Sequence, residues 1–450
     1  MSAITVTNWF GDIVWHPQVV VDANSVDDIV AVMKDPNAYP SPVRAVGANH
    51  SPAPCGVIEG GTMIRMKMNQ ILNIGTDTIT VEAGARHIDM AQQLTQQKLQ
   101  FYVNTEIGSL TAGSAACCGT KDGSMPGEYG QVGSYVIAVK MVLPDGNLLE
   151  VSEDRQPELM QKVRSSYGTF GIIYEVTFRI RPLTPLAVYH QTFGLEEFTR
   201  RLPELKARNE SMMYYVFPAT RKITIEFRRY NPGASGKPNR SGWKRRNDTW
   251  GRIGPKIVSL MWKYLPSPSL RYRMIDFFHG VWRLLLERVV KSDNTIPTDQ
   301  IIYYPPVSDD SRYTFSLFAF PEAEYPRVLA EFFDFRDAYL GKTGYRPNLM
   351  DVGYYIAQDQ KALLSYSYDS AVMTIDPVST GGEDWNKFLE AYNGFCSDRN
   401  GSPLPNQTLG ITPAILRKAF GERLKEMAET RKTFDPNGRL LNDYFRSLFT

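Results

Sequence analysis

Three glycine-rich loops in the first 184 of the 450 residues constrain this chain more than any other feature of its sequence. They span residues 47–51, 113–124 and 168–171. Because glycine has no Cβ, such loops bring backbone N–H groups close to a ligand, and clustered N–H groups bind phosphate oxygens. Any single loop could be only a tight turn. Three of them in one region predict a site for an anionic group such as a dinucleotide pyrophosphate.

The segments between the loops predict a mixed α+β unit. Residues 174–180 alternate between apolar and polar side chains, which is typical of a half-buried strand, and Pro182 ends it. Residues 137–143 and 148–151 flank the turn sequence Pro-Asp-Gly and predict a hairpin. Residues 88–99 carry apolar side chains at helical spacing.

The length and composition predict more than one folding unit. A chain of 50.9 kDa with 43% hydrophobic and 22% charged residues is too apolar for global disorder and too long for one core. We place a first domain at residues 1–184 and a second at 185–405. A C-terminal segment covers residues 406–450, in which residues 414–431 predict one helix.

Cysteine usage and the N-terminus bear on the compartment. The four cysteines include an adjacent pair and form no C-x-x-C motif, which favours a reducing compartment over a disulfide framework. The first residues do not resemble a signal peptide, and no apolar run approaches the ~20 residues of a membrane span. We therefore expect a cytoplasmic protein that could contact a membrane surface.

Common cofactor and metal motifs are missing from the sequence. No two glycines stand two residues apart, so the dinucleotide motif G-x-G-x-x-G does not occur. Gly341-Lys-Thr343 resembles the end of a phosphate-binding P-loop, but Arg336 stands where the upstream glycine is required. The five histidines are isolated from one another and from cysteine, so we expect no metal site.

Five segments in chain order resemble the motifs of one family. Residues 44–51 read R-A-V-G-A-N-H-S, and residues 80–84 read T-V-E-A-G. Residues 111–124 form the longest glycine-rich loop, residues 164–177 read R-S-S-Y-G-T-F-G-I-I-Y-E-V-T, and residues 434–442 read F-D-P-N-G-R-L-L-N. The set resembles flavoproteins of the vanillyl-alcohol oxidase superfamily, and within it the aldonolactone (gulonolactone and arabinonolactone) and alditol oxidases.

This resemblance implies an α+β fold with FAD as the cofactor. It implies a two-subdomain FAD-binding domain of the PCMH type, followed by an α+β cap domain with an antiparallel sheet that binds the substrate. The C-terminal segment then returns to the FAD-binding domain. The cofactor-binding residues implied by the matched motifs are Arg44, Val46, Gly47, Ala48, Asn49, His50, Ser51, Gly113, Ser114, Cys117, Cys118, Gly119, Thr120, Gly123, Ser124, Gly168, Gly171 and Ile172.

The resemblance also implies a covalent link between His50 and the C8 methyl group of the flavin. Taken alone, a histidine after a strand could be a plain hydrogen-bonding loop residue. Cys117 and Cys118 could form a second flavin bond, as a cysteine does in some relatives, or could be small residues packed beside the cofactor.

The substrate-binding motifs of the relatives are replaced in this chain. Lys121 and Asp122 stand where the family loop has a histidine. Residues 351–355 and 402–407 stand where relatives carry Glu-x-Arg and H-W-G-K, so charged donors for a sugar lactone are lost. The many tyrosines favour an aromatic pocket, although each could be only a strand residue. The candidates for the catalytic polar role are Asp351, Tyr354 and Tyr355.

Positive charge is concentrated in residues 237–291 of the second domain. This insertion holds thirteen Lys or Arg against three Asp or Glu, a net charge of +10, while the whole chain carries +2. It also holds four tryptophans and an amphipathic segment at 270–290. Such a segment suits an anionic membrane surface or an anionic substrate, or could be the solvated face of a cap insertion. It contains no recognised nucleic-acid-binding module, so we expect no nucleic-acid partner.

These patterns predict an FAD-dependent oxidoreductase, an oxidase rather than a dehydrogenase. We expect hydride removal from a C–H bond next to an alcohol or amine of a small, partly apolar or aromatic substrate, with molecular oxygen as acceptor. The alternatives are an aldonolactone- or alditol-type oxidase and a dehydrogenase for an anionic or lipid-linked substrate at the membrane. A weaker alternative is a non-catalytic basic protein that binds membranes or nucleic acid.

Overall fold

The computed structural model of the chain describes residues 4–304 and 311–449. A parallel sheet in the order β3-β5-β4 forms the first layer, and helix α1 packs on it through Ile29 and Val32. A capping box fixes the start of helix α1. The Ser25 hydroxyl accepts a hydrogen bond from the backbone N–H of Asp28, and the Asp28 carboxylate accepts one from the backbone N–H of Ser25. The elements are β1 (Val6–Thr7), β2 (Val14–Trp15), β3 (Val19–Ala23), α1 (Val26–Lys34), β4 (Val43–Val46) and β5 (Thr62–Met66).

A second, antiparallel sheet completes the N-terminal domain. Its strand order is β10-β9-β11-β7-β6, and β8 pairs with the end of β11. The hairpin around Pro144 and the strand ending at Pro182 are both confirmed. The elements are β6 (Ile71–Ile74), β7 (Thr78–Glu82), α2 (His87–Gln96), β8 (Leu99–Phe101), α3 (Ala112–Cys117), β9 (Val136–Val142), β10 (Leu148–Ser152), α4 (Pro157–Val163) and β11 (Ile172–Pro182).

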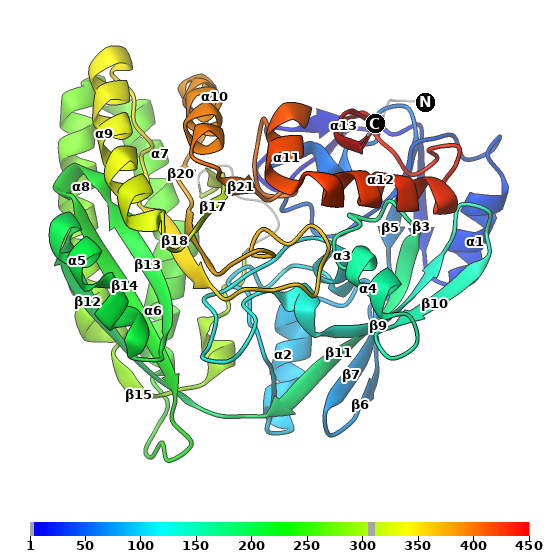
Figure 1. Cartoon of the computed structure of the whole chain (residues 1–450), viewed down its shortest axis with the longest axis horizontal. Helices are drawn as coiled ribbons and strands as arrows, with labels where there is room; N and C mark the ends of the chain where they lie inside the picture. The colour runs from blue at the N-terminus through cyan, green and yellow to red at the C-terminus, as the bar shows by residue number, and fades with distance from the viewer. Residues whose placement is uncertain (1–3, 305–310, 450) are drawn as a thin grey trace.

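An eight-stranded antiparallel sheet forms the cap, and it begins four residues after β11 ends (Figure 1). Its strand order is β15-β12-β14-β13-β18-β19-β17-β21, and the short pair β16–β20 stands apart from it. The elements are β12 (Leu186–Gly194), α5 (Leu195–Ala207), β13 (Ser211–Phe217), β14 (Lys222–Tyr230), β15 (Ser292–Thr295), β16 (Thr314–Phe315), β17 (Phe318–Pro321), α9 (Tyr325–Thr343), β18 (Asp351–Ile356), β19 (Val372–Ile375), β20 (Val378–Ser379), α10 (Glu383–Asp398) and β21 (Ser402–Pro403).

Helices cover both faces of the cap sheet. Side chains of α5, α9 and α10 share one core with Tyr214 and Val216 of β13. The alternate residues Met213 and Tyr215 face a second core, which is filled by the basic insertion. This insertion consists of α6 (Arg240–Asp248), α7 (Gly254–Tyr264) and α8 (Pro268–Leu285), with π-helical turns at Thr249–Ile253 and Leu286–Val290. In Figure 1 the insertion lies at the end of the molecule opposite α1.

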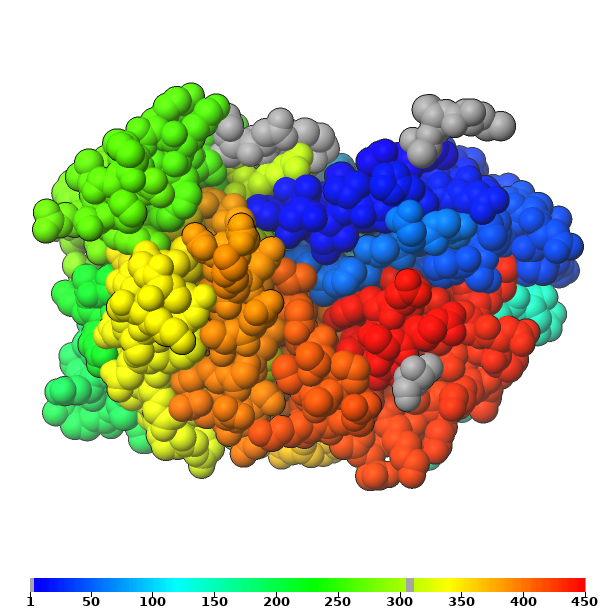
Figure 2. Space-filling view, turned by 90° about the horizontal axis from the view of Figure 1, so that it is seen from above, coloured from blue at the N-terminus to red at the C-terminus, as the bar shows by residue number. Residues whose placement is uncertain are grey.

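The C-terminal segment returns to the N-terminal domain, as Figure 2 shows for the red and blue parts of the chain. The Asn442 side chain donates hydrogen bonds to the carbonyls of Pro54 and Val57 at 3.0 and 2.9 Å. The predicted helical structure over residues 414–431 is confirmed except at Gly421, whose positive φ of 51° divides it into two helices. The helices are α11 (Pro413–Phe420), α12 (Glu422–Phe434) and α13 (Asp443–Phe449). No helix in the described ranges is long and apolar enough to cross a membrane.

Candidate active site

A cavity lies where the three glycine-rich loops of the N-terminal domain meet. It has roughly 1180 Å³ of empty space, its open mouth included. The loop that follows β4, the helix α3 and the turn before β11 all contribute to its lining. All of the predicted cofactor-binding residues line it except Gly119, Gly123 and Ser124. Loops that are far apart in sequence therefore surround one site.

Glycine is required where the first two loops approach each other. A Cβ on Gly47 would lie 2.4 Å from Oγ1 of Thr111 and 2.8 Å from Oγ of Ser114, closer than real Cβ atoms come. A Cβ on Gly171 would lie 2.9 Å from the Val142 carbonyl oxygen. The absence of a side chain at these positions lets the backbone itself form the cavity wall.

Arg44 connects the first loop to the third loop and to the C-terminal segment. Its guanidinium group donates to the carbonyl of Leu440 at 2.8 Å and to that of Tyr167 at 2.5 Å. Its Nε atom is buried and has no hydrogen-bond partner among the described residues. Since Arg44 lines the cavity, its positive charge lies beside any anionic ligand there.

His50 lies in the cavity wall with its ring held on two sides. The ring stacks on Trp9 with centroids 4.9 Å apart, and its Nε2 atom forms a 2.5 Å hydrogen bond with the Ser109 hydroxyl. Burial lowers the pKa of His50 to about 4. The imidazole is therefore neutral near pH 7, and one ring nitrogen keeps a lone pair.

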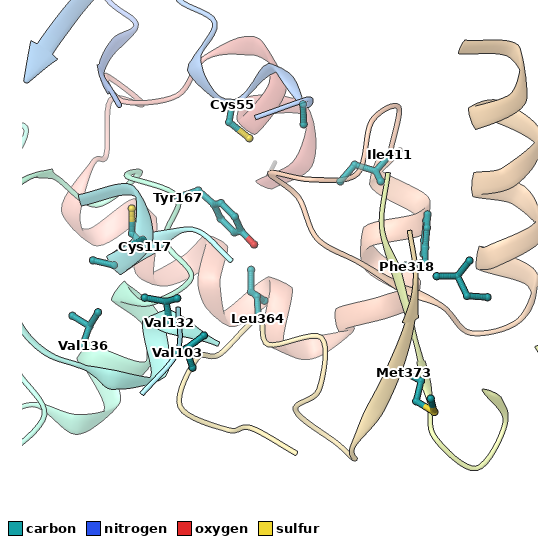
Figure 3. Packing of buried hydrophobic residues seen from close by; sticks show 14 of the residues in the cluster. Cys55, Val103, Cys117, Val132, Val136, Tyr167, Phe318, Leu364, Met373 and Ile411 are labelled. Atoms are coloured by element: carbon teal, nitrogen blue, oxygen red, sulfur yellow. The ribbon is translucent and has the colours of Figure 1, made fainter. Parts of the chain in front are cut away.

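The adjacent cysteines also line the cavity, together with Cys55. Figure 3 shows that Cys55, Cys117 and Tyr167 come from three separate segments into one buried cluster. The Sγ atoms of Cys117 and Cys118 are 3.9 Å apart, and all four cysteines of the chain are free thiols.

Gly119, Gly123 and Ser124 instead join the second loop to the cap and the segment after it. The carbonyl of Gly123 accepts a hydrogen bond from the Ser211 hydroxyl at 2.9 Å. The Ser124 hydroxyl accepts one from the backbone of Ala357, also at 2.9 Å. Between them, Lys121 and Asp122 form ion pairs with Asp376 and Arg228 of the cap.

A second cavity adjoins the first on the cap side. Both cavities are lined by Ile107, Leu110, Thr120, Phe315 and Gln407. The further lining residues of the second cavity are Thr105, Glu106, Lys121, Trp250, Tyr313, Val352, Tyr354, Asp376 and Val378. Apolar and aromatic side chains thus surround a small set of charged groups, the usual composition of a small-molecule site.

Lys121 and Asp376 form a buried ion pair in this second cavity. The Lys121 Nζ atom lies 2.9 Å from Oδ2 of Asp376 and 4.6 Å from the centre of the Tyr354 ring. The Asp376 Oδ1 atom is buried without a hydrogen-bond partner among the described residues. Burial raises the pKa of Asp376, while the Lys121 charge opposes this shift. An unpaired carboxylate oxygen with a raised pKa is suited to accept a proton.

Glu106 is the second carboxylate of this cavity. It pairs with Arg246, and its Oε2 atom accepts a 3.2 Å hydrogen bond from the Tyr354 hydroxyl. Arg246 also donates to the Tyr215 hydroxyl at 3.0 Å. Arg246 is therefore part of the site. In the sequence analysis it contributed only to the net positive charge of the insertion.

Of the three predicted catalytic residues, the structure brings only Tyr354 to the cavity. Successive side chains of a strand point to opposite faces, so Val352 and Tyr354 line the cavity while Asp351 and Tyr355 face away. Asp351 is instead fully buried in an ion pair with Arg336 of α9. Burial raises the pKa of Asp351 to about 6.

The sequence interpretation missed Glu106, Asp376 and Arg246, and it noted Lys121 only as a departure from the family motif. A carboxylate inside the apolar run at residues 372–378 was the available signal for Asp376. Asn406 and Gln407 lie in the segment that replaces H-W-G-K, and both side chains donate to the Gly119 carbonyl. Both also line the first cavity.

Comparisons with known proteins identify an FAD binding domain in the first part of the chain. Residues 17–152 match the family model described as an FAD binding domain. The chain is 22% identical to an L-gulonolactone oxidase from Mus musculus, over 98% of this chain and 97% of the relative. It is 25% identical to a D-arabinono-1,4-lactone oxidase from Kluyveromyces lactis, over 57% of this chain and 48% of the relative.

A solved structure supports the fold along the whole chain. The cholesterol oxidase from Brevibacterium sterolicum superposes with a TM-score of 0.76 at 14% identity, covering 99% of this chain and 96% of that one. This likeness confirms the predicted PCMH-type α+β fold. Together with the FAD binding domain at residues 17–152 and the similarity to the lactone oxidases, it indicates that the chain is an FAD-dependent oxidoreductase.

Proposed function

We propose that this chain is an oxidase that removes a hydride from a C–H bond next to an alcohol or amine of a small, partly apolar or aromatic substrate. FAD is attached covalently through His50, and molecular oxygen is the final electron acceptor. The observation that carries the proposal is the contact between the two cavities. A carboxylate with an unpaired oxygen, Asp376, lies in the cavity beside the one that fits the cofactor.

The first cavity has the features that FAD needs. Gly47, Gly113 and Gly171 line this cavity, so their backbone would contact the pyrophosphate, and the charge of Arg44 beside it would favour an anionic group. When bound, FAD supplies the two-electron acceptor for the substrate hydride. The protein's part is to orient the substrate, exclude water and accept the substrate proton.

The surroundings of His50 support the covalent bond. Only a neutral imidazole has a free lone pair for bonding to carbon, and burial keeps this one neutral. The Ser109 contact occupies Nε2, whereas Nδ1 has no hydrogen-bond partner among the described residues. We therefore assign the bond to Nδ1. Stacking on Trp9 holds the ring in the orientation that the bond requires.

Asp376 is the group that we assign to proton transfer. Its Oδ1 atom would accept the hydroxyl or amine proton as the C–H bond breaks. The Lys121 ammonium group stabilises the carboxylate form at 2.9 Å and keeps Asp376 ready to act as a base. Tyr354, oriented by Glu106, would position the substrate's polar group.

The apolar lining favours a substrate with apolar or aromatic character. Trp250, Tyr313, Phe315 and Val352 provide apolar and aromatic surface for such a substrate. An aldonolactone is the second candidate, because the sequence relatives are named for lactones and because Lys121 and Glu106 could bind hydroxyl groups.

We also propose that the protein works in the cytoplasm, at an anionic membrane surface. The four cysteines are free thiols, as a reducing compartment keeps them. On helix α7, exposed Lys256 and Lys263 alternate with exposed Leu260 and Tyr264. Basic and apolar side chains on one helix face are what binding to anionic lipid requires.

Anaerobic bleaching of the flavin absorbance tests the proposed reaction. Aromatic or long-chain primary alcohols should bleach it, and air should restore the colour while forming hydrogen peroxide. Bleaching by gulonolactone or xylitol, but by none of these alcohols, would overturn the substrate class. Failure of oxygen to restore the colour would overturn the oxidase assignment in favour of a dehydrogenase.

A further inference from the structure

A third cavity lies between α7 and α8, away from the cofactor loops. Its empty space is roughly 820 Å³, its mouth included, and aliphatic or aromatic side chains form most of the lining. His279 is one of the few polar groups, and burial lowers its pKa to about 3, so that its ring is uncharged. The lining residues are Thr249, Trp250, Ile253, Gly254, Pro255, Ile257, Val258, Ile275, Phe278, His279, Val281, Trp282, Leu285, Tyr313, Leu349 and Met350.

The mouth of this cavity opens on an apolar surface. Ile253, Phe278, Val281 and Leu285 line the cavity and are each 39–44% exposed. Phe277 beside them is 67% exposed. Nine of the fourteen exposed large apolar side chains in the described part of the chain lie within residues 253–285, so this surface is a concentrated patch rather than ordinary scatter.

Helix α8 has an unusual orientation that explains the patch. Its polar stripe faces the protein: Asp276 pairs with Arg346 at 2.6 Å, and Glu287 in the following turn accepts a 2.6 Å hydrogen bond from Thr192. Ile275 and Trp282 pack in the core of the cap, while further apolar side chains of α8 face outward, which leaves the helix with apolar residues on two sides. Exposed Arg273 and Arg288 flank the outward-facing side chains, a charge complement to anionic headgroups.

The inner end of the cavity reaches the site of the proposed reaction. Trp250 and Tyr313 line both this cavity and the one that contains Asp376. Their ring centroids are 6.1 Å apart. Two side chains thus separate an apolar chamber open to the surface from the chamber beside the cofactor.

We infer that the α7–α8 cavity binds the apolar tail of a long-chain amphiphilic substrate, which enters from the lipid bilayer and presents its polar end to Asp376. The inference rests on the proposed function for the fate of the polar end. Binding of the tail is measured separately from turnover. The substrate class is then a lipid-like alcohol or amine, which is taken up through the apolar patch on α7 and α8.

Titration with parinaric acid, a long-chain fatty acid that fluoresces in apolar surroundings, tests the tail site in the absence of vesicles. The probe should bind with a rise in fluorescence, and dodecanol should displace it at lower concentration than octanol, by roughly fourfold per methylene. Val281→Trp should fill the mouth and weaken binding by about tenfold or more, since several methylenes lose their burial. Leu284→Trp is the matched control, because Leu284 is equally exposed on α8 but does not line the cavity.

A second pair of variants keeps the test valid if one variant of the first pair misfolds. Ile257→Trp lies in the lining on α7, and Leu260→Trp is its exposed control outside the lining. Equal effects within each pair, or no displacement by dodecanol, would overturn the inference even if alcohols bleach the flavin. Probe binding at the cavity without any bleaching by alcohols would instead overturn the proposed function and leave a lipid-binding site.

Discussion

Asp376 is the residue on which the proposed chemistry depends most. Its side chain is buried, one oxygen is paired with Lys121 at 2.9 Å, and the other has no hydrogen-bond partner within bonding geometry among the described residues. Burial raises its pKa above the ordinary value of 3.8, which brings the carboxylate closer to the pKa of a useful base. Asp351 is an equally buried carboxylate with an arginine partner, but it lies outside both cavities.

Asp376→Asn should lower the rate of flavin reduction by about 10²–10⁴-fold, the usual contribution of a general base. In the unchanged protein the rate should rise with pH through the raised pKa of Asp376, because only the deprotonated form accepts a proton. The variant should lose this fall in rate at low pH, the acid limb of the pH profile. Stopped-flow bleaching across pH measures both effects. Asp351→Asn is the control, and an acid limb that persists in Asp376→Asn would exclude Asp376 as the base.

Gly47→Ala should lower the amount of flavin that the protein incorporates, because the new Cβ would lie 2.4 Å from Oγ1 of Thr111 and 2.8 Å from Oγ of Ser114 and must displace these cavity-lining groups. Gly56→Ala is the control within the same cavity lining, since its Cβ would meet nothing closer than 3.6 Å. The flavin-to-protein absorbance ratio reports the outcome. Equal flavin content in the two variants would contradict the close approach.

At the scale of elements, strand β18 shows where sequence interpretation stops. The loops could be predicted because their chemistry is local: glycine at positions 47, 113 and 171 permits the close approach wherever the loop lies. Strand β18 pairs with β13 and β19, and this pairing decides which of its faces meets the cavity. These strands lie far from β18 in the sequence, so no local sequence pattern fixes the register between them. The prediction therefore included Tyr354 but also Asp351 and Tyr355, which point to the other face.

Helix α8 shows the same limit. Its amphipathic spacing could be predicted from residues 270–290, and the helix formed there. The spacing could not tell which stripe faces the protein, because that depends on Arg346 and Thr192, which reach α8 from other elements. Glu106 and Asp376 escaped prediction for a similar reason, since residues more than 200 positions apart form one cavity.

Arg336→Leu should lower the free energy of unfolding by about 3–5 kcal/mol, because it leaves the buried Asp351 carboxylate without its partner. The double variant with Asp351→Leu should recover much of this loss. Arg221→Leu removes two ion pairs to Asp334 and Asp337 that are largely exposed, so it should cost less than about 1 kcal/mol. Urea unfolding followed by tryptophan fluorescence compares them, and equal losses would contradict the structural role of Asp351.

At the scale of the whole molecule, the two sides of the cap have different surroundings. One side of the cap meets the second glycine-rich loop of the N-terminal domain, through Gly123 and Ser124. The other side carries the helices of the insertion (Figure 1), with its exposed apolar patch and basic residues. The C-terminal segment ties the cap back to the N-terminal domain through α11, α12 and α13.

The protein should sediment with anionic liposomes, and added salt should weaken but not abolish the association, because salt screens charge and leaves apolar burial intact. Phe277→Ser, at the most exposed apolar position of the patch, should reduce binding at high salt several-fold. Leu148→Ser is the control, since Leu148 is 58% exposed on the N-terminal domain. No sedimentation of the unchanged protein at low salt would exclude the membrane surface as a partner.

The attachment of flavin at His50 tests the central claim most directly, because substrate, base and acceptor all depend on a cofactor in the first cavity. The measurement is the visible absorbance of protein precipitated with acid and redissolved in denaturant. The yellow flavin spectrum should remain with the unchanged polypeptide and move to the supernatant for His50→Ala. A polypeptide that is colourless after precipitation, with all flavin in the supernatant, would contradict the covalent assignment. A protein that carries no flavin even when expressed with an excess of riboflavin would contradict the account as a whole.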